Sequence, residues 1–319
     1  MRQRAIVIAG PTACGKSDVA ISIAGRLGGE IISADSRQVY RGMDIGTGKV
    51  EGRRDFSFGI SCPEPVFPFV SGGIRHWLID VADPCDEFTV ADFQRISLAV
   101  SDSVFARGRR LIVAGGTGFF VRSLTDGLDF PDVSVSQETR DLVRAMTAEE
   151  AASRLAELSP DAPGLVDMKN PRRVARALEL ILSGLPSISD MRRRRDLGID
   201  FMTIGITYPA EILRKRISDR LDARLAAGMV GEVRGLLDSG VPPGRLESFG
   251  LEYRWLGRHL AGLIGFDEMR ERLYFDICRF AKRQMTWFRK YCGVIWVDGA
   301  ESAFELASRF LETGERGVV

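Results

Sequence analysis

Close to its start the chain reads Gly10-Pro11-Thr12-Ala13-Cys14-Gly15-Lys16-Ser17, a complete G-x4-G-K-S pattern. An apolar run, residues 4–9, precedes it and an amphipathic stretch follows. In that context the glycines let backbone N–H groups curl around a phosphate, and the helix start adds partial positive charge. Lys16 would reach the outer phosphate oxygens and the Ser17 hydroxyl could bind Mg²⁺. The pattern predicts a strand, a phosphate loop and a helix, and a diphosphate or a triphosphate would fit it equally.

Cys14 lies among these phosphate donors and allows two interpretations. Its thiol could have a lowered pKa and raised reactivity, because helix starts favour the thiolate. It could also be only a small residue that fills the loop, and this second interpretation is favoured.

Further apolar, β-rich runs indicate a parallel sheet. They lie at residues 30–34, 77–81, 110–114, 201–207 and 294–297, with helical periodicity between most of them. Strands that alternate with helices need right-handed crossovers. The sequence therefore predicts an α/β fold, a P-loop NTPase-like parallel sheet with helices on both faces. Ligands would bind beyond the carboxyl ends of the strands.

The alternation stops between residues 130 and 200, where helix signals dominate. Thr147 and Glu150 have capping-box spacing before a helix through Leu158, and Asn170-Pro171 opens another helix through Leu182. We expect a core of residues 1–129 and 201–319 with a helical insertion at 130–200. Residues 46–73, rich in Gly, Pro and Phe, predict a long surface connection.

Composition narrows the class of protein. The 319 residues are 45% hydrophobic and carry a formal net charge of +1, so bulk electrostatics would not hold a nucleic acid, although local clusters could. The five cysteines lack CxxC spacing, which argues against a disulfide framework or a zinc site. No apolar run reaches membrane-spanning length. We expect a cytoplasmic protein with no membrane contact, and a monomer.

Polar residues also follow the second predicted strand. Asp35 could act as a general base or as an outer partner of Mg²⁺, and Gln38 could read the edge of a base. An Asp that only caps a helix or a turn is an equally good interpretation at this point.

Longer segments resemble one enzyme family, the tRNA dimethylallyltransferases (isopentenyltransferases). They are GPTACGKS, ADSRQVYRGMDIGTGK, WLIDVADP, FTVADF, IVAGGTGFF, NPRRVARALE, LRKRISDRLDARLAAGMVGEV and FAKRQMTWFRK. They occur in the family's order and extend from residue 6 to about residue 298. Single pieces such as GGTG are weak signals, whereas the ordered set is specific.

The resemblance implies that the loop holds the diphosphate of dimethylallyl diphosphate. The exocyclic N6 amine of the adenosine immediately 3′ of the tRNA anticodon would attack the allylic carbon, releasing diphosphate. Lys16, Mg²⁺ and Arg216 would neutralise the leaving group, although Arg214 and Lys215 compete for the role of Arg216.

Two further roles follow from the resemblance. Asp35 would accept the amine proton, and Thr117 would hydrogen-bond near the scissile oxygen. From the residues alone, a cap of a tight strand-to-helix turn is the favoured interpretation of Thr117.

The resemblance also implies a surface for the tRNA anticodon stem-loop. Solvated helix faces explain the Arg residues of the insertion as well, and the aromatic residues near residue 287 could be core. Arg192 to Arg195 fit phosphate contacts or an exposed loop equally. The predicted contacts are Asp35, Ser36, Arg37, Gln38, Thr117, Arg140, Arg172, Arg173, Arg176, Gly250, Tyr253, Arg254, Lys282, Arg283, Gln284, Trp287 and Arg289.

The sequence also departs from the family pattern in several places. Glu252 adds a carboxylate where many members carry GYRQL, Arg37 replaces an apolar or small residue, and residues 50–73 have no clear counterpart. The alternatives to tRNA prenylation are a small-molecule P-loop kinase, prenylation of free adenine nucleotides and a non-enzymatic binding module. The basic aromatic stretch near residue 287 favours a macromolecular acceptor.

Overall fold

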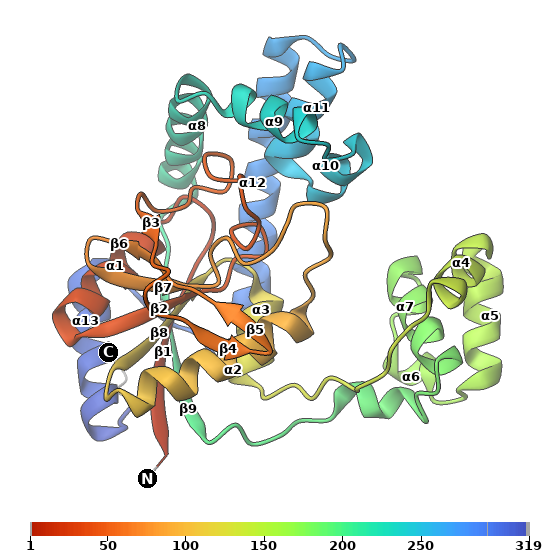
Figure 1. Ribbon diagram of the computed structural model, residues 1–319, viewed down its shortest axis with the longest axis horizontal. Coiled ribbons are helices and arrows are strands. Elements are labelled where there is room, and N and C mark those ends of the chain that lie inside the picture. The colour runs from red at the N-terminus through yellow and green to blue at the C-terminus, as the bar shows by residue number, and fades with distance from the viewer. Residues whose placement is uncertain (1, 292, 317–319) are drawn as a thin grey trace. The chain divides into compact units, whose positions relative to one another are not determined.

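The computed structural model describes residues 2–291 and 293–316, so Cys292 lies outside the described residues (Figure 1). The chain divides into two compact units, residues 1–125 with 198–319 and residues 126–197. The sequence placed the corresponding bounds at 130 and 200.

The first unit is built on a mostly parallel sheet. The described residues form eight strands in the order β10-β9-β1-β8-β2-β7-β6-β3. Neighbouring strands from β10 to β7 are parallel, and β6 and β3 continue one edge antiparallel. This confirms the predicted α/β class and P-loop NTPase-like sheet. The strands are β1 Gln3–Ala9, β2 Gly29–Ser33, β3 Arg53–Arg54, β6 Phe69–Ser71, β7 Ile74–Trp77, β8 Arg110–Gly115, β9 Ile199–Ile206 and β10 Ile295–Val297.

The strand predicted at residues 77–81 was wrong. The strand β7 ends at Trp77, because Leu78 and Asp80 have φ angles of 64° and 58°, which an extended strand does not allow. Leu78 is nevertheless fully buried in the core. An apolar run of this kind imitates a buried strand in the sequence.

The connection predicted at residues 46–73 also contains strands. Its strands β3 and β6 pair with each other, and β4 Ile60–Cys62 pairs with β5 Glu64–Val66 in a separate antiparallel hairpin. Each of these strands spans two or three residues, which is too short for an alternation pattern to be visible.

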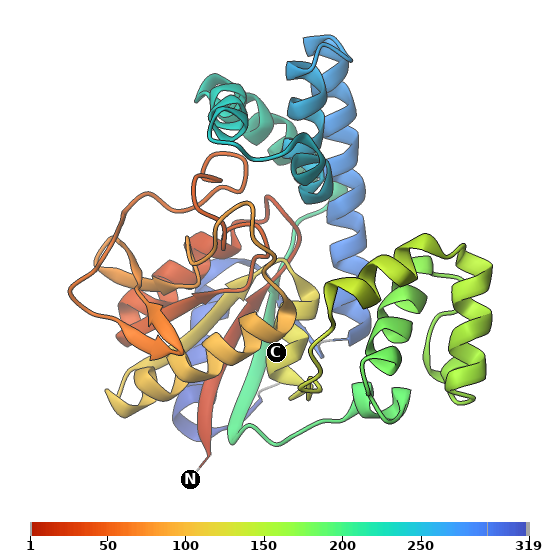
Figure 2. The ribbon, with the colours of Figure 1, turned by 45° about the vertical axis from the view of Figure 1, so that its right-hand side comes forward.

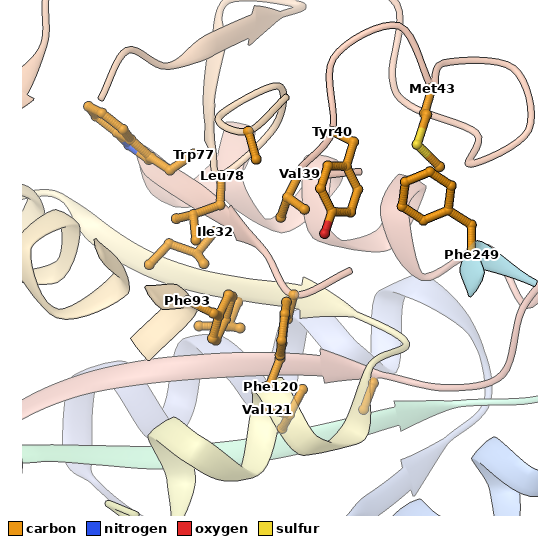
Figure 3. Close-up of a cluster of buried hydrophobic side chains, with 14 of the residues drawn as sticks. Ile32, Val39, Tyr40, Met43, Trp77, Leu78, Phe93, Phe120, Val121 and Phe249 are labelled. Carbon is orange, nitrogen blue, oxygen red and sulfur yellow. The ribbon is translucent and has the colours of Figure 1, made fainter. Parts of the chain in front are cut away.

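Helices cover both faces of the sheet, as predicted (Figure 1). On one face α2 Val90–Ala106 and α3 Gly118–Thr125 pack in the larger core, where Phe93 stacks on Phe120 at a centroid distance of 4.2 Å. Figure 3 shows these two rings below Ile32 and Trp77. On the other face α1 Lys16–Leu27 and α13 Gly299–Thr313 bury Ile and Val side chains of the strands.

The remaining helices of this unit follow β9. They are α8 Ala210–Ala226, α9 Met229–Asp238, α10 Pro243–Phe249, α11 Leu251–Leu260 and α12 Phe266–Tyr291. Figure 2 shows α12 as the longest, running from the level of α11 down beside the sheet, and it packs against α3, α8 and α11. No helix among the described residues is long and apolar enough to cross a membrane.

The second unit is helical and has its own apolar core. Its elements are α4 Gln137–Ala145, α5 Ala148–Leu158, α6 Ala162–Leu165, α7 Pro171–Leu182 and the 3-10 turn Ile188–Arg192. Thr147 and Glu150 form the predicted capping box at the start of α5, and Asn170 caps α7. Both predicted helices are confirmed, because local capping chemistry defines their starts.

Candidate active site at the carboxyl edge of the sheet

The phosphate loop connects β1 to α1 as predicted. A Cβ on Gly10 would lie 2.3 Å from the carbonyl oxygen of Ile206, so only glycine lets the loop approach β9 this closely. Ala13 has a φ of 65°, a left-handed conformation that disfavours a side chain by roughly 1–2 kcal/mol. Lys16 and Ser17 begin α1. Strain at a loop of this kind is typical of a binding site.

Cys14 is buried at 1% exposure, and its sulfur would lie 2.8 Å from a Cβ on Gly10. This placement fits the favoured interpretation that Cys14 fills the loop.

Side chains from α8 and α12 hold the loop from outside. Gln284 accepts a hydrogen bond from the Thr12 N–H and donates one to the Gly116 carbonyl, each at 2.8 Å. Arg216 donates to the Ala13 carbonyl at 2.8 Å, and Arg220 donates to the Thr12 hydroxyl. These bonds use the Thr12 N–H and hydroxyl and the Ala13 carbonyl, and none of them uses an N–H group of the first turn of α1, which are the groups that a helix start offers to an anion.

The ends of β2 and β8 bring Asp35 and Thr117 into neighbouring segments. Thr117 donates its N–H to the Ala34 carbonyl at 3.1 Å, and its hydroxyl oxygen accepts from the Ser36 N–H at 2.9 Å. Asp35 accepts from the Arg37 N–H at 2.9 Å. The hydrogen bonds of the Thr117 hydroxyl go to Ser36, so this side chain ties the two strand ends together, and its capping of a helix stays a prediction.

Gln38 and Arg37 are already engaged within the protein. Gln38 accepts from the Ser33 hydroxyl at 2.7 Å and donates to the carbonyls of Thr47 and Gly48 at 3.3 and 3.2 Å. Arg37 donates to the Phe249 carbonyl at 2.9 Å, and burial lowers its pKa. Both amide hydrogens of Gln38 are engaged, so Gln38 could donate to a base only after giving up one of these bonds.

The departure at Glu252 has a structural explanation. Its side chain is buried, which raises its pKa, and Arg224 lies 3.5 Å from its carboxylate as the opposing charge. Arg224 also donates to the Gly46 carbonyl at 3.0 Å. Burial lowers the pKa of Arg220 to about 10, which leaves it charged near neutral pH. The buried carboxylate thus offsets part of a dense group of arginines.

The predicted tRNA contacts occupy several environments. Gln284 and Tyr253 are buried, and Tyr253 donates to Glu232 at 2.9 Å, so neither is placed for direct contact. Gly250 starts α11 with a φ of 73°, and Arg254 lies 3.2 Å from Glu247. Trp287 is half-buried, and its ring packs closely against Gly118, since a Cβ on that glycine would lie 2.2 Å from the ring.

The other predicted contacts are largely exposed. Lys282, Arg283 and Arg289 lie on the open side of α12. The insertion has exposed Arg172, Arg173 and Arg176 on α7 and a half-exposed Arg140 on α4. In the stretch after α7, Arg193 and Arg194 pair with Asp190 and Asp126 inside the same unit, which fits a structural role.

Sequence reasoning missed Arg220 and the structural role of Gln284. Arg220 had a signal, because it stands four residues after Arg216 and so shares its helix face. Gln284 had none, because nothing local indicates that its amide faces a loop 272 residues away in sequence.

Comparison with known proteins identifies the family. A family model described as IPP transferase matches residues 38–291, and one described as isopentenyl transferase matches residues 3–54. A tRNA dimethylallyltransferase of Geobacter metallireducens is 38% identical, with 93% of each chain covered. One from Geobacillus thermodenitrificans is 36% identical, covering 93% of this chain and 91% of its own.

A solved structure agrees with these matches. The full-length tRNA isopentenylpyrophosphate transferase of Bacillus halodurans superposes with a TM-score of 0.67 and 30% identity, covering 98% of this chain and 97% of its own. With the phosphate loop and the strand-end polar groups in place, the chain belongs to the IPP transferase family.

Proposed function

We propose that this chain transfers the dimethylallyl group from dimethylallyl diphosphate to the N6 amine of the tRNA adenosine immediately 3′ of the anticodon. The observation that carries the proposal is the meeting of two half-sites at one edge of the sheet. A phosphate loop flanked by Arg216 and Arg220 lies on one side of β8, and Asp35 follows β2 on the other. The names of the relatives support the same activity.

The loop side suits a diphosphate leaving group. Loop N–H groups, the start of α1 and Lys16 bind the phosphate oxygens, while Arg216 and Arg220 add positive charge as the C–O bond breaks. Preorganised charge of this kind stabilises a departing diphosphate without reorganisation.

The donor set also fits Mg²⁺. Among the described residues no group of three or more His, Cys, Asp or Glu side chains could hold a metal ion by itself. Mg²⁺ commonly binds through few protein ligands, substrate phosphates and retained waters. We propose Ser17 as its protein ligand; the bound ion would neutralise diphosphate charge.

The acceptor side suits deprotonation of an amine. As the amine nitrogen forms its bond to the allylic carbon, the bond from that carbon to the bridging oxygen breaks, and the amine proton passes to Asp35. Thr117, whose hydroxyl is bonded to Ser36 next to Asp35 in the chain, would hydrogen-bond the departing oxygen. Diphosphate leaves with the electron pair of the broken bond.

A tRNA acceptor fits the exposed cations. We propose that Lys282, Arg283 and Arg289 on α12 contact phosphates and that the insertion supplies a second basic surface through Arg140, Arg172, Arg173 and Arg176. A stacked adenosine would have to leave its stack to reach Asp35. We further propose that the enzyme works as a monomer in the cytoplasm.

The test is transfer of labelled dimethylallyl from its diphosphate to unmodified tRNA with Mg²⁺. Parallel reactions use AMP as acceptor and ATP as a phosphoryl donor. We expect label in tRNA alone, located at the predicted adenosine by nuclease digestion and mass spectrometry. A tRNA carrying guanosine at that position is the matched control. Label in AMP would move the function to nucleotide prenylation, and ATP turnover without prenyl transfer would indicate a kinase.

A further inference from the structure

A small cavity, partly open to solvent, lies on the α1 face of the sheet, beside the first turn of the phosphate-loop helix. Its volume is about 20 Å³ and its polar lining comes from Ser17, Ser33, Gln38 and His76. The rest of the lining is apolar. One buried water needs roughly 10–15 Å³ and two to four polar partners. The cavity therefore has the size and the lining of a single-water site.

His76 is the group that needs such a partner. It is 4% exposed, and no described residue hydrogen-bonds to its Nε2. It pairs with Ile31 in the sheet, and both residues line the cavity. Burial lowers the pKa of His76 to about 4, so the ring is neutral near pH 7. A buried ring nitrogen without a partner is unfavourable, and buried polar groups in native proteins generally find one.

The facing groups have the complementary hydrogen-bonding capacity. The Ser33 hydroxyl donates to Gln38 Oε1 at 2.7 Å, and the Gln38 amide nitrogen is engaged with the Thr47 and Gly48 carbonyls. The Ser33 and Gln38 oxygens keep free lone pairs, and the Ser17 hydroxyl can donate or accept. Because these groups line the same pocket as His76, a water bound there has the polar partners that it needs.

We propose that this cavity binds one water molecule joining His76 to Ser17 and to the Ser33–Gln38 pair, which makes His76 a positioning residue for the diphosphate end of the site. The inference rests on the proposed function, because Ser17 is there the ligand of the diphosphate-bound Mg²⁺. The water orients the Ser17 hydroxyl from behind, as outer partners orient metal ligands elsewhere. His76 therefore acts through Ser17 without touching substrate.

The first test uses the fact that the chain has only two histidines, His76 and His259. Protein labelled with ¹⁵N in histidine gives two imidazole signal sets, and His259→Phe assigns them. We expect the His76 ring nitrogen signals to move when Mg²⁺ and inorganic pyrophosphate are added together, and those of His259 to stay. A high-resolution crystal structure should show one water within hydrogen-bond distance of Nε2.

Calorimetry on the same sample distinguishes a failure of this inference from a failure of the proposed function. Binding of Mg²⁺ and pyrophosphate without any change at His76 would overturn the water link and leave the proposed function intact. No binding at all would overturn the diphosphate site and the inference with it. A cavity that is dry in the crystal, or filled by a side chain, also overturns the inference.

Variants provide an independent measurement. His76→Phe keeps a ring but cannot bond to the water, and we expect it to raise the KM for dimethylallyl diphosphate and the half-saturating Mg²⁺ concentration about fivefold. kcat should change less than about twofold, because the chemical groups are untouched. His76→Gln, whose amide reaches the Nε2 position, should restore both values, and His259→Phe should match the wild type.

Equal losses in the Phe and Gln variants, or no change in the Phe variant, would contradict the proposal. If His76→Phe does not fold, the resonance and crystal measurements on the wild-type protein still decide the question.

Discussion

The phosphate loop and the segment Asp35 to Gln38 lie on either side of β8, yet they are held in opposite ways. Side chains of α8 and α12 bind the loop from outside, through Thr12 and Ala13. In the Asp35–Gln38 segment, by contrast, the side chains themselves form hydrogen bonds to backbone groups of the protein. The diphosphate half is therefore ready for its ligand, whereas on the acceptor half Gln38 must give up a hydrogen bond before it can donate to a base.

The largest expected effect comes from removing charge on the ready half. Lys16→Ala should lower kcat about a thousandfold, because a preorganised charge on the leaving group is lost. Single-turnover prenyl transfer measures it, and tRNA binding should be unchanged. The matched control is Lys215→Ala, whose side chain is 77% exposed beside Asp219. A kcat in the Lys16 variant within a few fold of wild type would contradict a role of the loop in the chemistry.

The next effect tests the acceptor half. Asp35→Asn keeps an oxygen that can accept the Arg37 N–H but removes the base, so kcat should fall about 10²- to 10⁴-fold with tRNA affinity nearly intact. Asp83→Asn, an exposed partner of Arg41, is the control. Comparable turnover in the Asp35 variant would remove that carboxylate from the mechanism.

A smaller effect tests whether side chains of α12 hold the phosphate loop in place. Gln284→Leu loses the bonds to Thr12 and Gly116, so the free energy of unfolding should fall by about 2 kcal/mol. The KM for dimethylallyl diphosphate should rise more than the Kd for tRNA. Thr286→Ala, exposed on the same helix, is the control. A selective loss of tRNA affinity would instead return Gln284 to the predicted tRNA surface.

The smallest effect concerns the tRNA surface. Arg283→Ala should weaken tRNA binding about threefold and reduce the salt dependence of log K by roughly one phosphate contact. The KM for dimethylallyl diphosphate should not change. Arg309→Ala, exposed on α13 on the other face of the sheet, is the control. Equal effects of the two substitutions would mean that α12 has no special place in tRNA binding.

Local chemistry in the sequence predicted much of the fold. The phosphate loop, the helix starts at Thr147 and Asn170, and most parallel strands depend on neighbouring residues, and the structure confirms them. The strand predicted at residues 77–81 was misplaced because Leu78 is buried with a left-handed backbone. A buried apolar run looks the same in the sequence whether or not its backbone is extended.

The candidate site was predictable only in part, because its contacts cross long sequence separations. Asp35, Lys16 and Thr117 follow strands, so their meeting at one edge could be predicted. The amide of Gln284 and the guanidinium of Arg220 reach the loop from helices more than 200 residues further along the chain. Such partners are set by packing, which no local pattern indicates.

The row of arginines on α8 has a consequence for the spacing of the whole site. Arg216, Arg220 and Arg224 stand one turn apart and reach Ala13, Thr12 and Gly46 in succession. The helix therefore fixes the spacing between the phosphate loop and the loop whose carbonyls bind Gln38. One residue inserted between Arg216 and Arg220 would rotate Arg220 and Arg224 about the helix axis by about 100° relative to Arg216. Their bonds to Thr12 and Gly46 would then be lost together. The same insertion after residue 226, where α8 ends, would leave the spacing of the three arginines unchanged.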